Sequence, residues 1–225
     1  MNKSKPEAEA DGKARRAREA ENMEKQRLGV KAGEGAGGHE PAAAELYDVL
    51  LRFIAARSSV LAAAAAAFVT CVRAGGKILI FGNGGSAAEA QHFAAELVNG
   101  MQHRGRPPIP AIALTTDTSS LTAIGNDRGF DHVFSRQVEA LGRPGDVAVA
   151  LTTSGTSPNI VEALKMARAK GLVTVALTGE GGGAVVPLAD FLLDVPCRST
   201  PRVQEAHLFI LHLLAGRLEE SLGAP

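Results

Sequence analysis

Two segments rich in glycine and hydroxyl residues follow short apolar runs in this chain of 225 residues. The first is Gly82-Asn83-Gly84-Gly85-Ser86, and the second extends from Thr152 to Ser157. Glycine allows backbone conformations with positive φ, and Ser86 stands where the N-cap of a helix belongs. The free N–H groups at the start of a helix bind phosphate. One such segment is equally typical of an ordinary turn, but two of them predict a phosphate site.

Neither segment is a known nucleotide-binding motif. A Gly-Lys-Ser/Thr triplet is missing from both, and the first apolar run is not followed by G-x-G-x-x-G. Binding of a nucleoside triphosphate or of a dinucleotide therefore has no support from these segments.

Candidate acid–base and metal-binding residues lie in two helical segments. His92 and Glu96 are four residues apart and so share a helix face. Such a pair binds a metal ion or transfers protons, although a plain surface contact is the commoner explanation. Gln204, His207 and His212 lie in the last helical segment, and His212 falls beside its apolar stripe. A neutral buried histidine is the simpler interpretation of His212, and a histidine with a tuned pKa is the functional one.

A further polar group, Asn126 and Asp127, lies between two expected helices. Gly, Asn and Asp favour a turn at such a place, and Asp117 upstream is expected to cap a helix.

The elements that would position these residues alternate along the chain. Apolar runs predict strands at 77–81, 111–114, 147–151, 173–177 and 191–195, and helical patterns occupy 87–98, 159–170 and 201–222. This alternation predicts an α/β fold, a three-layer sandwich in which helices flank a five-stranded parallel sheet. Since parallel strands end on one edge, the two polar loops are expected to meet there.

The chain divides into an N-terminal tail and a folded domain. Residues 1–40 carry few large apolar residues and a Gly-rich stretch, which predicts a disordered tail. Residues 41–225 are expected to form the folded domain and to begin with N-terminal helices. Two apolar stripes occur before residue 73, and Arg57-Ser58-Ser59 bends or separates them. We expect this region to pack against the sheet domain and against another subunit.

Composition narrows the function classes. Hydrophobic residues make up 45%, charged residues 21%, and the formal net charge is zero, so nothing indicates a nucleic-acid partner. Cys71 and Cys197 are far apart without metal-site spacing, which favours a reducing compartment. The start of the chain has no apolar signal region, and the apolar run at 60–72 is short for a membrane span. These features predict a cytoplasmic protein without membrane contact.

The motifs taken together resemble phosphoheptose isomerases of the sugar isomerase (SIS) domain family. The resemblance extends from about residue 43 to residue 222. It rests on the glycine loop and on five further motifs: Gln91-His92-Phe93-Ala94-Ala95-Glu96-Leu97, Ala123-Ile124-Gly125-Asn126-Asp127, Phe134-Ser135-Arg136-Gln137-Val138, Thr153-Ser154-Gly155-Thr156-Ser157 and Val203-Gln204-Glu205-Ala206-His207.

This resemblance implies an activity. It is the aldose–ketose isomerisation of D-sedoheptulose 7-phosphate to D-glycero-D-manno-heptose 7-phosphate through an enediolate. That reaction is the first step towards the nucleotide-activated heptose, ADP- or GDP-linked, of surface glycans such as lipopolysaccharide. The resemblance also implies a homotetramer with active sites between subunits, and one zinc ion per subunit.

The same resemblance implies the site residues. The catalytic pair is Glu96 and His212, and the metal ligands are His92, Glu96, Gln204 and His212. The substrate contacts are Asn83, Gly84, Gly85, Ser86, Glu96, Asn126, Asp127, Thr152, Thr153, Ser154, Ser157 and Gln204. Thr152 replaces a serine found in many relatives and keeps the hydroxyl. The eight residues from Gln204 to His212 span roughly 12 Å of helix, so both reach one ion only through converging side chains, an irregular helix or different subunits.

Two other functions fit the same domain. A non-catalytic SIS-domain protein that binds a replication initiator is expected to lack the carboxylate and the final histidine, whereas Glu96 and His212 are present here. A sugar-phosphate-sensing regulator is expected to carry a DNA-binding domain, and residues 1–40 do not have the sequence of one. Both comparisons favour the enzyme.

Overall fold

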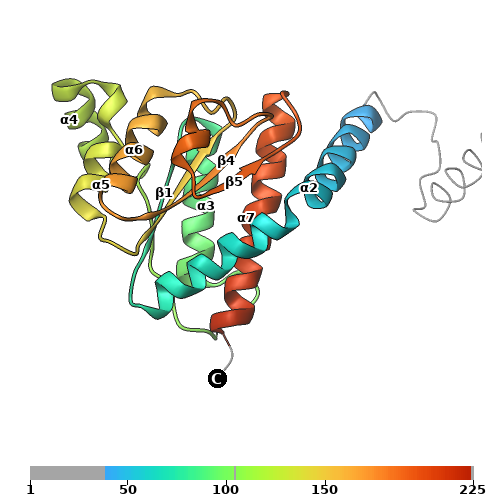
Figure 1. Ribbon diagram of the computed structural model, residues 1–225, viewed down its shortest axis with the longest axis horizontal. Coiled ribbons are helices and arrows are strands. Elements are labelled where there is room, and N and C mark those ends of the chain that lie inside the picture. The colour runs from blue at the N-terminus through green and yellow to red at the C-terminus, as the bar shows by residue number, and fades with distance from the viewer. Residues whose placement is uncertain (1–38, 104, 224–225) are drawn as a thin grey trace, which may run out of the picture. The chain divides into compact units, whose positions relative to one another are not determined.

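The computed structural model describes residues 39–103 and 105–223, and the predicted tail at 1–40 lies almost wholly outside them. By its internal contacts the chain divides after Ala43, and the fold described here is that of the unit that begins at Ala44. In that unit a parallel sheet lies between two layers of helices (Figure 1). The predicted α/β three-layer architecture is confirmed.

The sheet has the strand order β2-β1-β3-β4-β5, and each neighbouring pair is parallel. Its strands are β1 (Ile78–Gly82), β2 (Ala111–Ala113), β3 (Val147–Thr152), β4 (Val173–Thr178) and β5 (Phe191–Asp194). Every residue of β1 and β3 is buried. Strands covered on both faces are continuously apolar, and for this reason the sequence predicted each of them to within one residue at either end.

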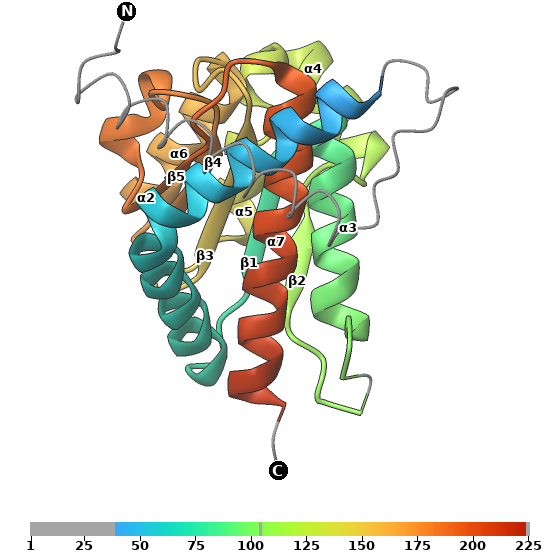
Figure 2. The same cartoon turned by 90° about the vertical axis from the view of Figure 1, so that its right-hand side faces the viewer.

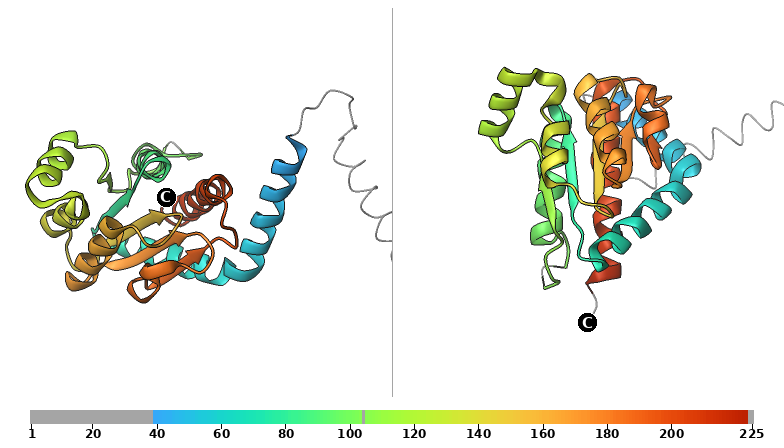
Figure 3. Two further views of the ribbon diagram at one scale, coloured as in Figure 1. Left: turned by 90° about the horizontal axis from the view of Figure 1, so that it is seen from above. Right: turned by 60° about the vertical axis from the view of Figure 1, so that its left-hand side comes forward.

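Two hydrophobic cores fill the spaces on either side of the sheet. Side chains alternate along a strand, so Ile78 and Ile80 belong to one core while Leu79 and Phe81 belong to the other. The first core packs against α2 (Glu40–Arg73), α3 (Gly85–Asn99) and α7 (Thr200–Leu222). The second packs against α4 (Thr118–Arg128), α5 (Ser135–Leu141) and α6 (Pro158–Ala169). Figure 3 shows these helices on opposite sides of the sheet.

Short 3-10 helices connect some of these elements. They are η1 (Phe130–His132) and η2 (Gly183–Leu188). Asp117 caps α4 as expected, because its carboxylate accepts a hydrogen bond of 3.0 Å from the N–H of Ser120.

The helix before the sheet is continuous. α2 runs without interruption through Arg57, Ser58 and Ser59, and the ribbon changes direction part-way along it (Figure 2). Of the two outcomes expected at these residues, the structure shows a bend and not a separation. Arg57 also forms an ion pair of 2.5 Å with Asp194 of β5, which ties α2 to the edge of the sheet.

α2 is also the one helix in the described part of the chain that is long and apolar enough to cross a membrane. Length and composition alone are weak evidence, since a core helix passes the same test. Phe53 and Phe68 of α2 are completely buried in the first core. These contacts make α2 part of the folded unit.

Helices α3 and α7 lie side by side and run in the same direction (Figure 2). Contacts repeat along their length: Glu89 faces His207, Glu96 faces His212, and Glu219 accepts hydrogen bonds from the segment after α3. Because the two helices are parallel, residues of α3 and of the segment after it meet residues of α7 in the same order along the chain.

Candidate active site

The first glycine loop joins β1 to α3. Gly84 has a φ of +57°, a conformation that glycine adopts without strain. Gly82 is packed so tightly that a Cβ there would lie 2.8 Å from Ser86 Cβ and 2.9 Å from Leu151 O. Glycine is therefore required at the two positions for different reasons: Gly84 forms the turn, and Gly82 allows close packing of the loop on the sheet.

The helix after this loop starts earlier than the sequence indicated. Its N-cap is Gly84 rather than Ser86, and the N–H of Ser86 already bonds to the carbonyl of Asn83 at 3.0 Å. The prediction that Ser86 caps the helix was wrong, because the positive φ of Gly84 makes the turn without a side-chain cap. Ser86 is buried in the first turn instead.

The second loop follows β3 and is stabilised by its own hydroxyl groups. The N–H of Gly155 donates to Thr152 Oγ1 at 3.2 Å, and the N–H of Thr156 donates to Ser154 Oγ at 3.3 Å. Thr152 is buried, Thr153 and Ser157 are half-buried, and Ser154 is exposed. Three of the four predicted hydroxyl contacts thus retain some access to solvent.

The two loops meet at the carboxyl edge of the sheet, as predicted. Asn83 and Asn159 exchange two hydrogen bonds of 2.9 Å through their side-chain amides. Asn159 is in the first turn of α6, directly after the second loop. This reciprocal amide pair ties the two candidate phosphate loops to each other.

Three ionisable side chains converge on the outer side of α3 and α7. His92 Nε2 and His212 Nε2 are 3.0 Å apart, and each lies close to Glu96 Oε1, at 3.2 and 3.3 Å. The other oxygen of Glu96, Oε2, is buried and has no hydrogen-bond partner. The prediction that Glu96 and His212 approach each other is confirmed within a single chain.

The donor set of this cluster fits a metal ion. Zinc–ligand bonds of 2.0–2.1 Å in a tetrahedron place the ligand atoms about 3.3 Å apart, close to the separations found here. Two imidazole nitrogens and one carboxylate oxygen are ordinary zinc ligands. The three ligand atoms face one another at these separations, so His92, Glu96 and His212 could hold a zinc ion.

Gln204 lies elsewhere on α7. Its amide packs against Gly85, where an added Cβ would meet Gln204 Nε2 at 2.5 Å. Gly85 and Glu96 are eleven residues apart on α3, which is roughly 16 Å of helix. Gln204 thus stands at the glycine loop, where a substrate contact suits it, and at a distance from the cluster it was expected to join as a ligand.

Asn126 and Asp127 occupy the last turn of α4 and are exposed. Their side chains bond to each other at 2.8 Å. Among the described residues, no contact joins them to the glycine loop or to the cluster. A single chain does not bring these two predicted contacts together with the rest.

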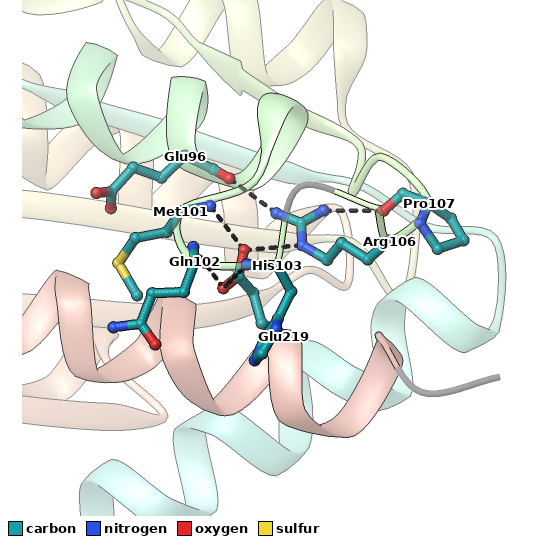
Figure 4. Close-up of polar contacts among 7 residues, drawn as sticks. All are labelled: Glu96, Met101, Gln102, His103, Arg106, Pro107 and Glu219. Atoms are coloured by element: carbon teal, nitrogen blue, oxygen red, sulfur yellow. Dashed lines mark hydrogen bonds and ion pairs between the residues drawn. The ribbon is translucent and has the colours of Figure 1, made fainter.

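The sequence did not indicate a buried ion pair below the cluster. Glu219 of α7 accepts hydrogen bonds from the N–H groups of Met101, Gln102 and His103 and from Arg106 Nε (Figure 4). Arg106 also donates to the backbone carbonyl of Glu96 at 2.8 Å. The network therefore fixes the end of α3 that carries Glu96. Three of the donors to Glu219 are backbone N–H groups of a loop, which leave no pattern in a sequence.

Sequence comparison identifies the relatives of the chain. A phosphoheptose isomerase from Rhodospirillum rubrum is 53% identical over 162 residues, which cover 72% of this chain and 86% of the relative. One from Aquifex aeolicus is 49% identical and covers 78% and 92%. The SIS domain model matches residues 43–179. The chain belongs to the phosphoheptose isomerase family.

Solved phosphoheptose isomerases share the fold. The structure from Neisseria gonorrhoeae matches with a TM-score of 0.76 at 44% identity, over 80% of this chain and 96% of that one. The structure from Francisella tularensis matches with a TM-score of 0.78 at 38% identity and the same coverage. Both structures belong to phosphoheptose isomerases, so the fold seen here is shared with solved members of the family.

Proposed function

We propose that this enzyme interconverts D-sedoheptulose 7-phosphate and D-glycero-D-manno-heptose 7-phosphate through an enediolate. The reaction supplies the first intermediate for a nucleotide-activated heptose. The proposal rests on membership in the phosphoheptose isomerase family together with one observation. Glu96 Oε1 of α3 and His212 Nε2 of α7, 116 residues apart in sequence, lie 3.3 Å apart, and α3 begins at the glycine loop.

Glu96 acts as the base in this proposal. An aldose–ketose exchange moves a proton between two adjacent carbons, and a carboxylate held close to them can accept it. Oε1 faces the two histidines, whereas Oε2 is buried without a partner.

His212 has two proposed roles that exclude each other in time. Its Nε2 atom faces Glu96 Oε1 and His92 Nε2, so it can carry a proton to the substrate oxygen or serve as a metal ligand. One nitrogen cannot do both at once. Proton transfer by His212 therefore requires Nε2 to be free of metal.

We assign one zinc ion per subunit to His92, Glu96 and His212. Bound zinc would supply positive charge that stabilises the oxygens of the enediolate. Gln204 is assigned to the substrate at the glycine loop, because its amide lies against Gly85. A fourth ligand is left to the substrate, to water or to another subunit.

The phosphate of the substrate is assigned to the two loops at the sheet edge. Asn83, Gly84, Gly85 and Ser86 contribute the first, and Thr152, Thr153, Ser154 and Ser157 the second. Binding energy from this remote group positions the reacting carbons at Glu96. Asn126 and Asp127 of α4 are also assigned to the substrate, and since one chain does not bring them to the loops, we assign them to the site of a neighbouring subunit.

The assembly is proposed to be a cytoplasmic homotetramer without nucleic-acid or membrane partners. The cluster is open on its outer side, with His92 and His212 side chains 47% and 41% exposed. A neighbouring subunit over this face would exclude water from the reacting carbons. Residues 1–40 are proposed to be a tail outside the catalytic domain.

The decisive experiment is incubation of the purified protein with sedoheptulose 7-phosphate, followed by phosphorus NMR. We expect a second sugar-phosphate resonance to grow until equilibrium is reached. An unchanged spectrum, both with and without added zinc, would contradict the enzyme and favour a non-catalytic SIS-domain protein.

Glu96→Gln tests the assignment of the base. A positioned base contributes about 100-fold or more to the rate, so we expect kcat to fall by at least that factor. Binding of the reduced, non-isomerisable sugar alcohol phosphate should persist in calorimetry, since the phosphate loops are untouched. Glu162→Gln, at an exposed glutamate paired with Lys165 on α6, is the matched control. Full activity of Glu96→Gln would remove Glu96 as the base.

A further inference from the structure

A second pair of ionisable side chains bridges α3 and α7, between the glycine loop and the cluster. Glu89 Oε2 and His207 Nδ1 lie 3.9 Å apart. Both atoms are buried, and neither has a hydrogen-bond partner in the structure. The His207 ring is completely buried and the Glu89 side chain is 12% exposed. Buried polar atoms without partners are rare, so two that face each other require an explanation.

The tautomer of His207 follows from its other nitrogen. Nε2 lies 3.2 Å from the backbone carbonyl of Thr178, at the end of β4. A carbonyl oxygen only accepts hydrogen bonds, so Nε2 must carry the proton. In a neutral imidazole the remaining nitrogen is then an acceptor. Nδ1 therefore needs a donor, and Glu89 is the group that faces it.

Glu89 can be that donor only in its acid form. Burial raises the pKa of Glu89 to about 7, against the opposing effect of a hydrogen bond from Ser86. Burial lowers the pKa of His207 to about 4, with the Thr178 contact opposing it. Between these two values the acid has its proton and the imidazole is neutral.

Four strands beside this pair carry no charged side chain, and on α3 the titratable neighbour of Glu89 is His92, one turn along. The strands packed against α3 are β1, β2 and β3, and β4 packs against α7. Their sequences contain no ionisable residue. From α7, His207 is the titratable group that faces Glu89, and from α3 itself the neutral Ser86 is hydrogen-bonded to it. The pKa shifts of Glu89 and His207 are thus set mainly by burial, with the contacts to Ser86 and to Thr178 opposing it.

We infer that the acid form of Glu89 turns its O–H towards His207 Nδ1 and closes the 3.9 Å between the two atoms, and that this neutral bridge is a positioning pair, which fixes α3 on α7 beneath the reacting groups. His92 is one turn beyond Glu89, and His212 is five residues beyond His207. Ser86 links the pair to the glycine loop, and Thr178 links it to the sheet. The catalytic part of this inference rests on the proposed isomerase; the bridge itself does not.

Loss of the Glu89 proton should disturb the site. The carboxylate would then face a nitrogen lone pair, two acceptors in a dry space, and the two helices would separate at this level. We expect the kcat of the wild-type protein to fall as the pH rises above 7. Glu89→Gln keeps a permanent N–H donor and should flatten that alkaline fall, with kcat at pH 6 within about twofold of wild type. Glu89→Ala removes the donor, and misplacement of the cluster should lower kcat on the order of tenfold at every pH.

Stability tests the bridge without reference to activity. The raised pKa of Glu89 makes the folded state lose stability as pH rises from 4.5 to 7, because only the unfolded chain releases the proton in that window. The lowered pKa of His207 makes it lose stability as pH falls from 6.5 to 4. In wild type the two effects oppose each other between 4.5 and 6.5.

Each single variant removes one of these two pH dependences of stability, and the two variants should differ from wild type in opposite directions. Relative to wild type, the urea midpoint of Glu89→Gln should increase as pH rises from 4.5 to 7, and that of His207→Gln should increase as pH falls from 6.5 to 4. Glu162→Gln should follow wild type. Equal pH slopes in Glu89→Gln and wild type would overturn the inference, whatever the activity of the protein.

Nitrogen NMR of the histidine rings gives an independent answer. The signals of His207 are assigned as those that disappear in His207→Gln. At pH 6 we expect them to show a neutral ring that is protonated on Nε2. The Nδ1 signal should have the chemical shift of a nitrogen that accepts a hydrogen bond. A charged ring, or a proton on Nδ1, would overturn the inference. If the protein does not isomerise sedoheptulose 7-phosphate, the NMR and stability results still decide the bridge.

Discussion

Glu96 is the residue on which two proposed tasks converge. One oxygen faces two imidazole nitrogens and the other is buried without a partner, so the two oxygens of one carboxylate have different surroundings. The sequence predicted this meeting of Glu96 with His212 through a family resemblance. Spacing on one helix showed only that His92 and Glu96 share a face.

Removal of one imidazole should release the metal. Loss of a residue that only hydrogen-bonds to a metal ligand weakens metal binding by up to ~100-fold. We expect His92→Ala, which removes a ligand itself, to weaken zinc binding by more than this. Metal analysis after dialysis against a competing chelator measures this. His132→Ala, at an exposed histidine in η1, is the control and should retain the zinc content of wild type. Equal zinc in His92→Ala would contradict the assigned ligand.

Gly155 in the second loop should tolerate no side chain. It has a φ of +67°, and a Cβ there would lie 2.0 Å from Gly182 O. We expect Gly155→Ala to lower the free energy of unfolding by more than the ~1–2 kcal/mol that the backbone conformation alone costs. Gly75→Ala isolates that backbone cost, since Gly75 has a φ of +78° with open space around it. Denaturant unfolding compares the two, and equal losses would exclude the clash.

Residues such as Glu89 and Gln204 mark the limit of sequence reasoning at this scale. A single glutamate in an alanine-rich helix has the pattern of a surface residue, and only the parallel neighbour α7 buries it. Likewise, Gln204 was expected at both the substrate and the metal. Its place against Gly85 depends on the register of two helices, which no local pattern contains.

At the scale of elements, the network of Glu219 and Arg106 holds the end of α3. Burial alone would raise the pKa of Glu219, but hydrogen bonds from the N–H groups of Gln102 and Met101, from Arg106 and from His103 outweigh it and lower the pKa to about 2. Both side chains are 1% exposed. The carboxylate is therefore a structural group that must stay charged.

The pH dependence of stability follows from this lowered pKa. Glu219 stabilises the folded state fully above pH 4.5, and that contribution is lost as pH falls towards 2. We expect Glu219→Gln to be destabilised by about 3–5 kcal/mol at pH 7, because a buried Arg106 loses its partner. The loss should shrink towards pH 2. Glu220→Gln, one residue along on the exposed face, should match wild type in urea unfolding. A loss independent of pH would show that packing, not charge, is responsible.

The strands were predicted more accurately than the helices that connect them. β1 and β3 are buried on both faces, so their apolar runs are uninterrupted. α5 has seven residues and η1 has three, which is too short for a period of 3.6 to emerge. The bend in α2 was left open in the sequence because tertiary packing, and not propensity, decides whether a helix continues.

At the scale of the molecule, the outer faces of the helices suggest where copies of the chain meet. Tyr47 and Leu51 of α2 are 64% and 52% exposed, and Val98 of α3 is 48% exposed. Large apolar side chains on an outer face are typical of an interface. These exposed side chains are consistent with the homotetramer proposed above.

Charge on that face should break the assembly. In gel filtration with light scattering, we expect the wild-type protein to have the molar mass of four chains. The double variant Tyr47→Asp/Leu51→Asp should have a lower molar mass and reduced activity. Val186→Asp in η2, at a residue 43% exposed, should remain tetrameric. A monomeric wild type that is fully active would contradict the assembly proposal.

The parallel course of α3 and α7 also limits how the length of this chain can change. Eleven residues of α3 separate the glycine loop from Glu96, and eight residues of α7 separate Gln204 from His212. Insertion or deletion of one residue in either interval would turn everything beyond it by about 100° around the helix axis. Both intervals must therefore keep their length, and we expect a change in chain length to be tolerated only outside them.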